Sequence, residues 1–117
     1  MIAKSAIINN CKIGTDTDIW EFANLYNCNI GNNCTIGPFV EIQNNVTIGD
    51  KTTISSHSFI CALVTVGDNV FIGTNVTINP GIQIDNNIII GSGSVVTKNL
   101  SKQGIYFGNP AEEYVKY

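Results

Sequence analysis

A six-residue hydrophobic period runs through most of this 117-residue chain and restricts its fold more than any other feature. Every sixth residue from position 30 to position 96 is isoleucine or valine: Ile30, Ile36, Ile42, Ile48, Ile54, Ile60, Val66, Ile72, Ile78, Ile84, Ile90 and Val96. The same spacing extends upstream, with one residue missing before Ile30, through Ile7, Ile13, Ile19 and Leu25. A short repeat of this kind indicates a solenoid, in which each unit buries its apolar face only against neighbouring units.

Two further phases of the repeat define its turns. The residue two places before each member of the aliphatic column is small or β-branched, as at Cys28, Val40, Thr52, Val64 and Val76. Three places after the column, asparagine or glycine recurs: Asn33, Asn45, Asn69, Asn75, Gly81, Asn87 and Gly93. These two residue types tolerate left-handed backbone angles, so this phase marks the corners. Each unit is therefore a short strand plus a turn, and three units close a triangular coil whose strands pair in parallel with the next coil.

Composition narrows the class of partner. The chain has six Lys and Arg against nine Asp and Glu, a net charge of −3, which argues against binding to nucleic acid or to anionic membranes. No apolar run approaches the roughly 20 residues of a membrane helix. The N-terminal residues lack the apolar stretch of a signal peptide. We therefore expect a cytoplasmic protein.

The four cysteines do not form a metal-binding or disulfide pattern. None lies in a CxxC pair, and Cys11, Cys28 and Cys34 occupy the small inward phase of the repeat, whereas Cys61 does not. Buried free cysteine behaves as a small hydrophobic residue. We expect free thiols and no metal.

The repeat ends after Val96, and residues 101–117 are expected to form an extension of the β-helix of residues 1–100. Asn109 and Pro110 together have the form of an N-cap followed by proline at the first helical position. The segment 111–115 is therefore predicted to form a short helix that covers the open end of the coils.

The repeated Ile-Gly-Asp/Asn-Asn pattern resembles that of the hexapeptide-repeat acyltransferases. The resemblance extends through residues 90–98 and the sequence Gly-Asn-Pro-Ala at 108–111, and it covers nearly the whole chain. It implies a left-handed parallel β-helix of about five triangular coils. It also implies a homotrimer, with active sites in the grooves between neighbouring chains.

A narrower resemblance is to bacterial nucleotide-sugar N-acetyltransferases of surface-polysaccharide synthesis. It rests on residues 19–22, 56–61 and 71–77. It implies transfer of an acetyl group from acetyl-CoA to a nucleotide-linked amino sugar. Many of those enzymes have a longer loop after the segment that matches Asn79, and some have an additional N-terminal nucleotide-sugar-binding domain. This sequence matches neither feature, so O-acetylation of a sugar and acetylation of serine stay open as alternatives.

The resemblance also implies that acetyl-CoA lies near the C-terminal coils. By position, Gly73, Thr74, Gly91, Ser92 and Gly93 are expected to bind its pantetheine arm through backbone groups, because glycine lets a ligand approach closely. Turn geometry by itself would also explain each glycine. The basic residue just after the last repeat, Lys98, is expected to meet a phosphate of CoA.

His57 is the single histidine and the predicted general base. Acyl transfer needs a base for the acceptor and donors for the oxyanion, and imidazole titrates near neutral pH. Histidine also tolerates left-handed angles, so a role as a turn residue stays open. In relatives with a histidine base, that residue stands four places before the aliphatic column, a phase held here by Asn44, which is predicted to bind substrate. Other relatives work without a protein base.

Trp20 is the second predicted substrate-binding residue. Its ring would stack on a sugar or a nucleotide base, or it would pack in the trimer interface instead.

Other proteins with this type of fold fit less well. A γ-type carbonic anhydrase needs three histidines for each zinc ion, and one histidine per chain does not supply them. A β-helical antifreeze protein needs a Thr-x-Thr ladder over several coils, and no face repeats threonine across more than two. A non-catalytic structural role remains an alternative.

Overall fold

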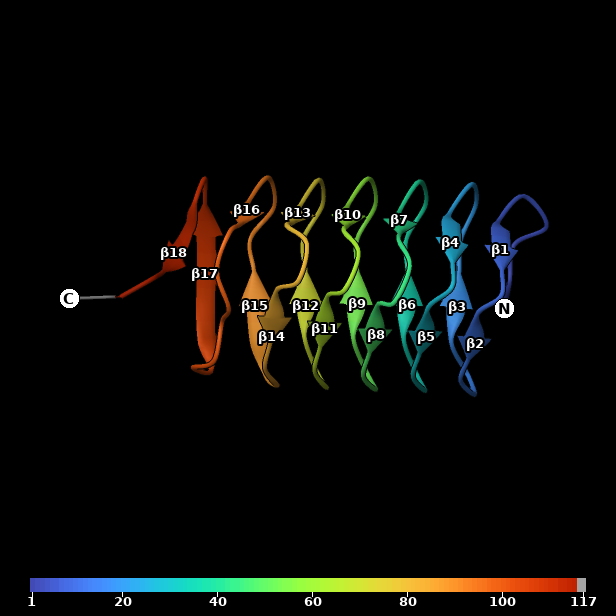
Figure 1. Ribbon diagram of the computed structural model, residues 1–117, viewed down its shortest axis with the longest axis horizontal. Coiled ribbons are helices and arrows are strands. Elements are labelled where there is room, and N and C mark those ends of the chain that lie inside the picture. Colours follow the sequence, from blue (N-terminus) through green and yellow to red (C-terminus); the bar gives the residue numbers. More distant parts are fainter. Residues whose placement is uncertain (116–117) are drawn as a thin grey trace.

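The computed structural model describes residues 1–115 and is an all-β parallel β-helix, as predicted (Figure 1). The first sheet contains β1 (Ile7–Asn9), β4 (Asn24–Tyr26), β7 (Glu41–Ile42), β10 (Phe59–Ile60), β13 (Thr77–Ile78) and β16 (Val95–Val96). The second contains β2 (Lys12–Ile13), β5 (Asn29–Ile30), β8 (Thr47–Ile48), β11 (Thr65–Val66) and β14 (Gln83–Ile84). The third contains β3 (Asp18–Ile19), β6 (Thr35–Ile36), β9 (Thr53–Ile54), β12 (Phe71–Ile72), β15 (Ile88–Ile90), β17 (Gly104–Gly108) and β18 (Ala111–Glu113).

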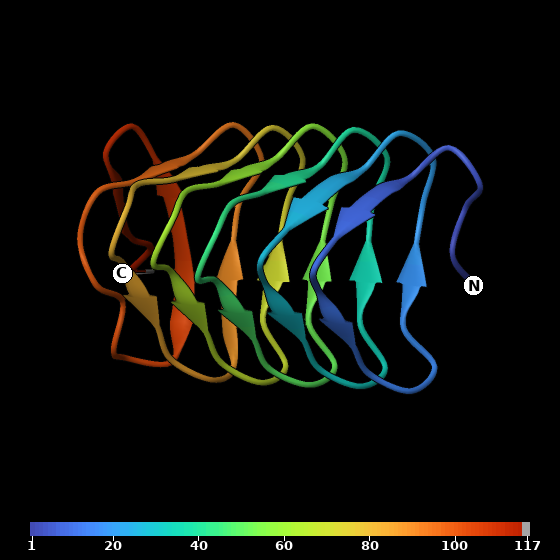
Figure 2. The ribbon, with the colours of Figure 1, turned by 45° about the vertical axis from the view of Figure 1, so that its right-hand side comes forward.

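The six strands of the first sheet correspond to six turns of the solenoid, one more than the number expected. The coils stack along one axis into a rod of 46 × 22 × 21 Å, with the chain ends at opposite ends (Figures 1 and 2). No segment of the described chain forms a helix long and apolar enough to span a membrane.

The aliphatic column is the core. Each of its members from Ile19 to Val96 is buried, and the small residues two places earlier close the triangle around it. Ile13, nearer the open N-terminal end, is half-buried and packs against this core. The prediction is wrong for Ile7, which is 56% exposed. Ile8 stands opposite Leu25 instead, because the pairing of β1 with β4 sets Ile7 against Asn24.

The register explains this shift. Neighbouring coils are offset by 17 residues at Ile7↔Asn24 and Asn24↔Glu41, by 18 from Asn29↔Thr47 as far as Thr77↔Val95, and by 16 where β15 pairs with β17. The first two coils are therefore each one residue shorter at the corner between the first and second sheets. The residue that they lack is the one that Asn44 provides in the third coil.

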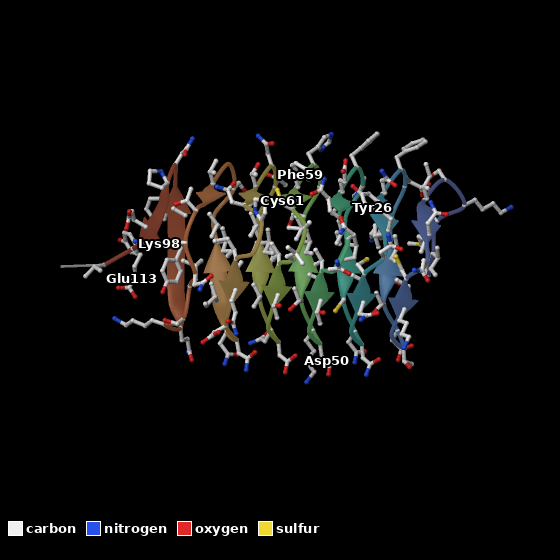
Figure 3. All side chains as sticks on the ribbon, in the orientation of Figure 1. Tyr26, Asp50, Phe59, Cys61, Lys98 and Glu113 are labelled. Atoms are coloured by element: carbon white, nitrogen blue, oxygen red, sulfur yellow. The ribbon has the colours of Figure 1, made fainter. Side chains whose placement is uncertain are left out.

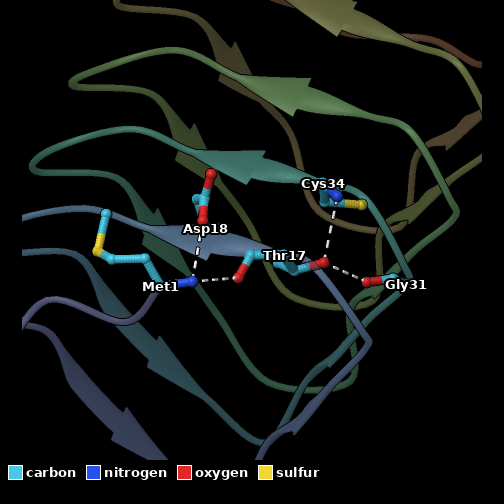
Figure 4. Close-up of polar contacts among 5 residues, drawn as sticks. All are labelled: Met1, Thr17, Asp18, Gly31 and Cys34. Atoms are coloured by element: carbon cyan, nitrogen blue, oxygen red, sulfur yellow. Dashed lines mark hydrogen bonds and ion pairs between the residues drawn. The ribbon is translucent and has the colours of Figure 1, made fainter.

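Buried hydroxyl groups join successive coils inside the prism. The Thr17 hydroxyl donates to the Gly31 carbonyl oxygen at 2.7 Å and accepts from the Cys34 backbone nitrogen at 3.1 Å (Figure 4). Thr52 and Ser58 make the same pair of bonds in later coils. At the N-terminal end the Met1 ammonium lies 2.9 Å from the Asp18 carboxylate. Polar side chains in the core are thus satisfied and help to fix the register.

Each corner from Asn10 to Gly93 places one residue in the left-handed region of backbone space, as the asparagine phase predicts. The corner between the second and third sheets also has a side-chain ladder. In it, Asn32, Asp50, Asp68 and Asn86 each accept a hydrogen bond of 2.7–2.8 Å from a backbone nitrogen of the preceding coil. We call this edge the ladder corner. It explains why Asp or Asn follows the Ile-Gly pair so often.

The predicted C-terminal helix is wrong. Residues 104–108 form β17, which pairs in parallel with β15, and β18 pairs back on β17 as an antiparallel hairpin. The Asn109–Pro110 peptide, expected at a helix N-terminus, is cis and lies in the hairpin turn. Tyr106 and Ala111 are buried over the last coil. Pairing with the free edge of β15 satisfies backbone groups that a helix would leave open.

All four cysteines are free thiols. Cys28 and Cys34 are buried as predicted, while Cys11 is half-buried at the open N-terminal end, 3.3 Å from the Cys28 sulfur. Burial raises the pKa of the Cys28, Cys34 and Cys61 thiols, so these groups stay neutral near pH 7.

Candidate functional site

The corner between the third and first sheets carries aromatic side chains where the ladder corner carries amides and carboxylates. The Phe22 and Phe39 rings stack with centroids 5.1 Å apart, and the Phe39 ring stacks on the His57 imidazole at 5.0 Å. All three side chains are exposed. We call this edge, with Asn75 and Gly93 in the following coils, the aromatic corner.

The backbone at this corner makes the aromatic residues unusual. Phe22, Phe39 and His57 have φ angles of 60°, 59° and 62°, in the left-handed region. A bulky residue there costs about 1–2 kcal/mol, and asparagine costs less. Asn75 occupies the equivalent place one coil further on. The turn itself does not require phenylalanine at this position, although Leu63 at another corner also has a left-handed angle.

His57 is accessible but is not held by an acid. Its backbone nitrogen donates to the Pro38 carbonyl oxygen at 3.0 Å, and its ring contacts Phe39. Within residues 1–115 no side-chain hydrogen bond or ion pair involves the imidazole. One chain therefore presents the imidazole to solvent.

The residues expected to bind CoA form the next two coils of the same edge. The Ser92 hydroxyl accepts a hydrogen bond from the Thr74 backbone nitrogen at 3.1 Å. A Cβ at Gly73 would lie 2.7 Å from the Ser92 nitrogen, so close stacking requires glycine there. Gly93 has φ +76°, and a Cβ added to it would meet no atom within 4 Å. Close stacking of the coils thus accounts for Gly73 and turn geometry for Gly93, and the surface beside Gly93 is open.

The other predicted site residues lie apart from each other. Trp20 is exposed in the first coil of the aromatic corner. Lys98 lies at the C-terminal end (Figure 3). Its ammonium is 3.2 Å from the Glu112 carboxylate. Asn44 lies at the corner between the first and second sheets. It lines a shallow hollow of about 490 Å³ formed where the short first coils meet the longer third coil, with Asn10, Lys12, Asn27, Asn29 and Asn45.

A polar network on the first sheet was not predicted. The Tyr26 hydroxyl donates to Oε2 of Glu41 at 3.1 Å, and the Gln43 amide donates to the same oxygen at 3.4 Å. The Gln43 carbonyl oxygen accepts from the Ala62 backbone nitrogen at 3.0 Å. Partial burial and the bond to Glu41 raise the pKa of the Tyr26 hydroxyl. Figure 3 labels Tyr26, Phe59 and Cys61 along this side.

The sequence contains a signal for this network. Residues immediately before the aliphatic column are mostly threonine, asparagine or phenylalanine between positions 29 and 77, and Glu41 is the single carboxylate among them. The described residues contain no group of three or more histidine, cysteine, aspartate or glutamate side chains that could hold a metal ion.

The chain matches a family model described as bacterial transferase hexapeptide (six repeats) over residues 27–62 and 64–98, more than half of its length. No curated protein matches the sequence.

Solved structures share the fold. The acetyltransferase domain of PglB from Neisseria gonorrhoeae is 16% identical with a TM-score of 0.95, and 97% of this chain aligns with 57% of that one. PerB from Caulobacter crescentus, solved with CoA and GDP-perosamine, is 21% identical with a TM-score of 0.94, and 97% of this chain covers 56% of it. A mutant of AntD, an N-acyltransferase from Bacillus cereus, is 23% identical with a TM-score of 0.91, and 97% of this chain aligns with 78% of that one. The chain thus spans a little over half the length of the solved chains of the PglB domain and of PerB.

Proposed function

Because the chain belongs to the bacterial transferase hexapeptide family, we propose that it transfers the acetyl group of acetyl-CoA to the amine of a nucleotide-linked sugar. The observation that carries this proposal is the aromatic corner, where the His57 imidazole lies exposed, one coil from Gly73 and Thr74. PglB has been solved with acetyl coenzyme A and PerB with CoA and GDP-perosamine, which supports both the donor and the acceptor class.

The chemistry needs one base and one leaving group. The neutral amine nitrogen attacks the thioester carbonyl carbon, the bond from that carbon to the CoA sulfur breaks, and the sulfur takes up a proton. In this proposal His57 accepts the proton that the amine loses. Backbone groups near Gly91, Ser92 and Gly93 hold the pantetheine arm. Trp20, at the other end of the same edge, contacts the sugar or its nucleotide.

A homotrimer is part of the proposal. The outward residues Phe71, Ile89 and Ile105 are each more than 40% exposed, and they lie in register on β12, β15 and β17. Such a continuous apolar stripe on the third sheet is typical of an interface. A second chain against this stripe would convert a flat face into a groove. Sedimentation should give a species near three times 12.6 kDa, and a clean monomer at micromolar concentration would contradict the trimer.

We further propose that the reaction takes place in the cytoplasm, without nucleic acid or membrane. Three of the four free thiols are buried in a chain with no disulfide among its described residues, which suits a reducing compartment.

The direct test is release of free CoA thiol from acetyl-CoA with a panel of acceptors. Amino-sugar nucleotides should be acetylated, whereas simple sugars and serine should not. Faster turnover with a sugar hydroxyl or with serine would reassign the acceptor. If titration calorimetry detected no binding of CoA, the enzyme function itself would be wrong and a structural role would replace it.

A further inference from the structure

Glu41 is a half-buried carboxylate with no cation to balance its charge. It is the single acidic residue on the strands of the first sheet, and those strands contain no lysine, arginine or histidine. None of the ion pairs found within residues 1–115 involves it. A carboxylate removed from part of its water is costly unless it is paired or hydrogen-bonded. Its partner must therefore be the two neutral donors, a ligand, or another molecule.

The two neutral donors satisfy only one side of the carboxylate. Both the Tyr26 hydroxyl and the Gln43 amide donate to Oε2, and no described group donates to Oε1. The donors fix the orientation of the side chain, while the second oxygen stays available. A surface carboxylate without a function would be free to rotate. The fixed orientation of Glu41, with one oxygen unoccupied, is instead typical of a preorganised binding residue.

The position of Glu41 relates it to the aromatic corner. It follows Phe39 by two residues, and it stands opposite Phe59 in the pairing of β7 with β10. His57 precedes Phe59 by two residues and stacks on Phe39. The carboxylate therefore lies on the face next to the edge that carries the imidazole, on the neighbouring coil.

We propose that Oε1 of Glu41 binds the ammonium group of the acceptor and positions it beside His57, an inference that rests on the proposed function. Amines of this kind are largely protonated near neutral pH, and an ammonium offers three donors to a carboxylate. The overall reaction is R–NH₃⁺ plus acetyl-S-CoA giving R–NH–acetyl, CoA–SH and one proton. His57 first takes one proton from the bound ammonium and releases it to solvent, which frees the nitrogen lone pair for attack. The second proton leaves the nitrogen after the new C–N bond has formed and goes to the CoA sulfur as the C–S bond breaks. Glu41 thereby selects an amine over a hydroxyl acceptor.

The test compares wild type with Glu41→Gln, in which the amide oxygen can still accept from Tyr26. The probes are GDP-perosamine and dTDP-4-amino-4,6-dideoxyglucose, the amino-sugar nucleotides named with PerB and AntD. We expect KM for whichever probe is used to rise roughly 10- to 100-fold, as for loss of one charge-assisted hydrogen bond. The melting temperature and the affinity for CoA should not change. Glu41→Asp should recover part of the loss. Asp85→Asn, which removes an exposed carboxylate from the other side of the prism, is the control and should leave KM unchanged.

A pH series separates binding of the ammonium from a structural effect. The deficit of Glu41→Gln should shrink as pH rises and the amine of the probe loses its charge, whereas a merely structural defect would persist. If wild type acetylates a probe and Glu41→Gln has the same KM at every pH, the inference is wrong while the proposed function stands. If Glu41→Gln instead weakens the oligomer in sedimentation, Glu41 pairs with a second chain and the inference is also wrong. A wild-type enzyme that binds CoA but acetylates neither probe would contradict the proposed acceptor, and this inference with it.

Discussion

The ladder corner and the aromatic corner are built from the same six-residue repeat, but they use their side chains in opposite ways. At the ladder corner each Asn or Asp accepts a backbone hydrogen bond from the coil before it, at 2.7–2.8 Å. At the aromatic corner, Phe22, Phe39 and His57 stack on one another, and their ring atoms take no part in joining the backbones of successive coils. The ladder corner therefore joins one coil to the next at four successive steps, whereas at the aromatic corner only Ser5 and Ser92 make such a bond. The aromatic corner carries exposed rings on strained backbone, and we assign to it the binding of substrate.

This contrast has a general consequence for a solenoid. Such a fold has no interior cleft, so any binding surface must lie on a face or an edge. Because the column and the ladder corner already hold the coils together, another edge is free to carry residues that the stack does not need.

The largest effect should come from the core that both corners share. Ile54 is fully buried in the middle of the column, and Ile54→Asp would place an unpaired charge there at a cost of at least about 3–5 kcal/mol. That is comparable with the whole stability of a domain. We expect unfolded protein by circular dichroism, whereas Ile54→Val should lose only about 1 kcal/mol. Soluble Ile54→Asp protein with an unchanged melting temperature would show that Ile54 does not lie in the core.

The next effect separates function from structure at the aromatic corner. His57→Asn keeps a residue that suits the left-handed angle, since Asn75 occupies the equivalent place. Turnover should fall by roughly 10² to 10⁴ if His57 is the base, with the melting temperature unchanged. A loss below about tenfold would reduce His57 to a turn residue.

A smaller and opposite result is expected at the ladder corner. The Asp50 carboxylate accepts from the Asn32 backbone nitrogen at 2.8 Å, and Asp50→Ala removes that bond at a cost of about 0.5–1.5 kcal/mol. The melting temperature should fall by about 3–6 °C. Turnover at saturating substrate should not change. A fall in turnover without a fall in melting temperature would show that the two edges are not specialised as described.

The smallest change in stability should follow from Phe39→Asn. The substitution relieves left-handed strain but removes ring stacking worth about 0.5–1.5 kcal/mol, so the two effects nearly cancel. We expect the melting temperature to stay within about 3 °C of wild type, while KM for the acceptor rises. A marked drop in stability with unchanged KM would make the aromatic corner structural.

Much of the fold could be predicted from local sequence rules. Two wrong predictions show where those local rules are insufficient. The column and the corners were predictable because every unit repeats the same small set of apolar and left-handed positions. Ile7 was misplaced, since two consecutive isoleucines offer two registers and only the pairing of β1 with β4 selects Ile8. The C-terminal helix was wrong because the Asn-Pro signal is local, whereas the free edge of β15 lies far away in sequence.

The site residues also separate into features that the sequence predicted and features that only the tertiary structure decided. The sequence by itself placed His57, Gly73, Thr74, Gly91, Ser92 and Gly93 at corners, because a fixed period determines the phase of each residue. Only the tertiary structure decided which corner each one shares. The tertiary structure stacks His57 on Phe39 and places Asn44 on a different edge. It also brings Tyr26 into hydrogen-bond contact with Glu41 on the adjacent coil. The position of a residue within the repeat depends on six consecutive residues, so the sequence reveals it. An edge is formed by residues that are 17 or 18 positions apart, and that offset changes between the first coils and the later ones.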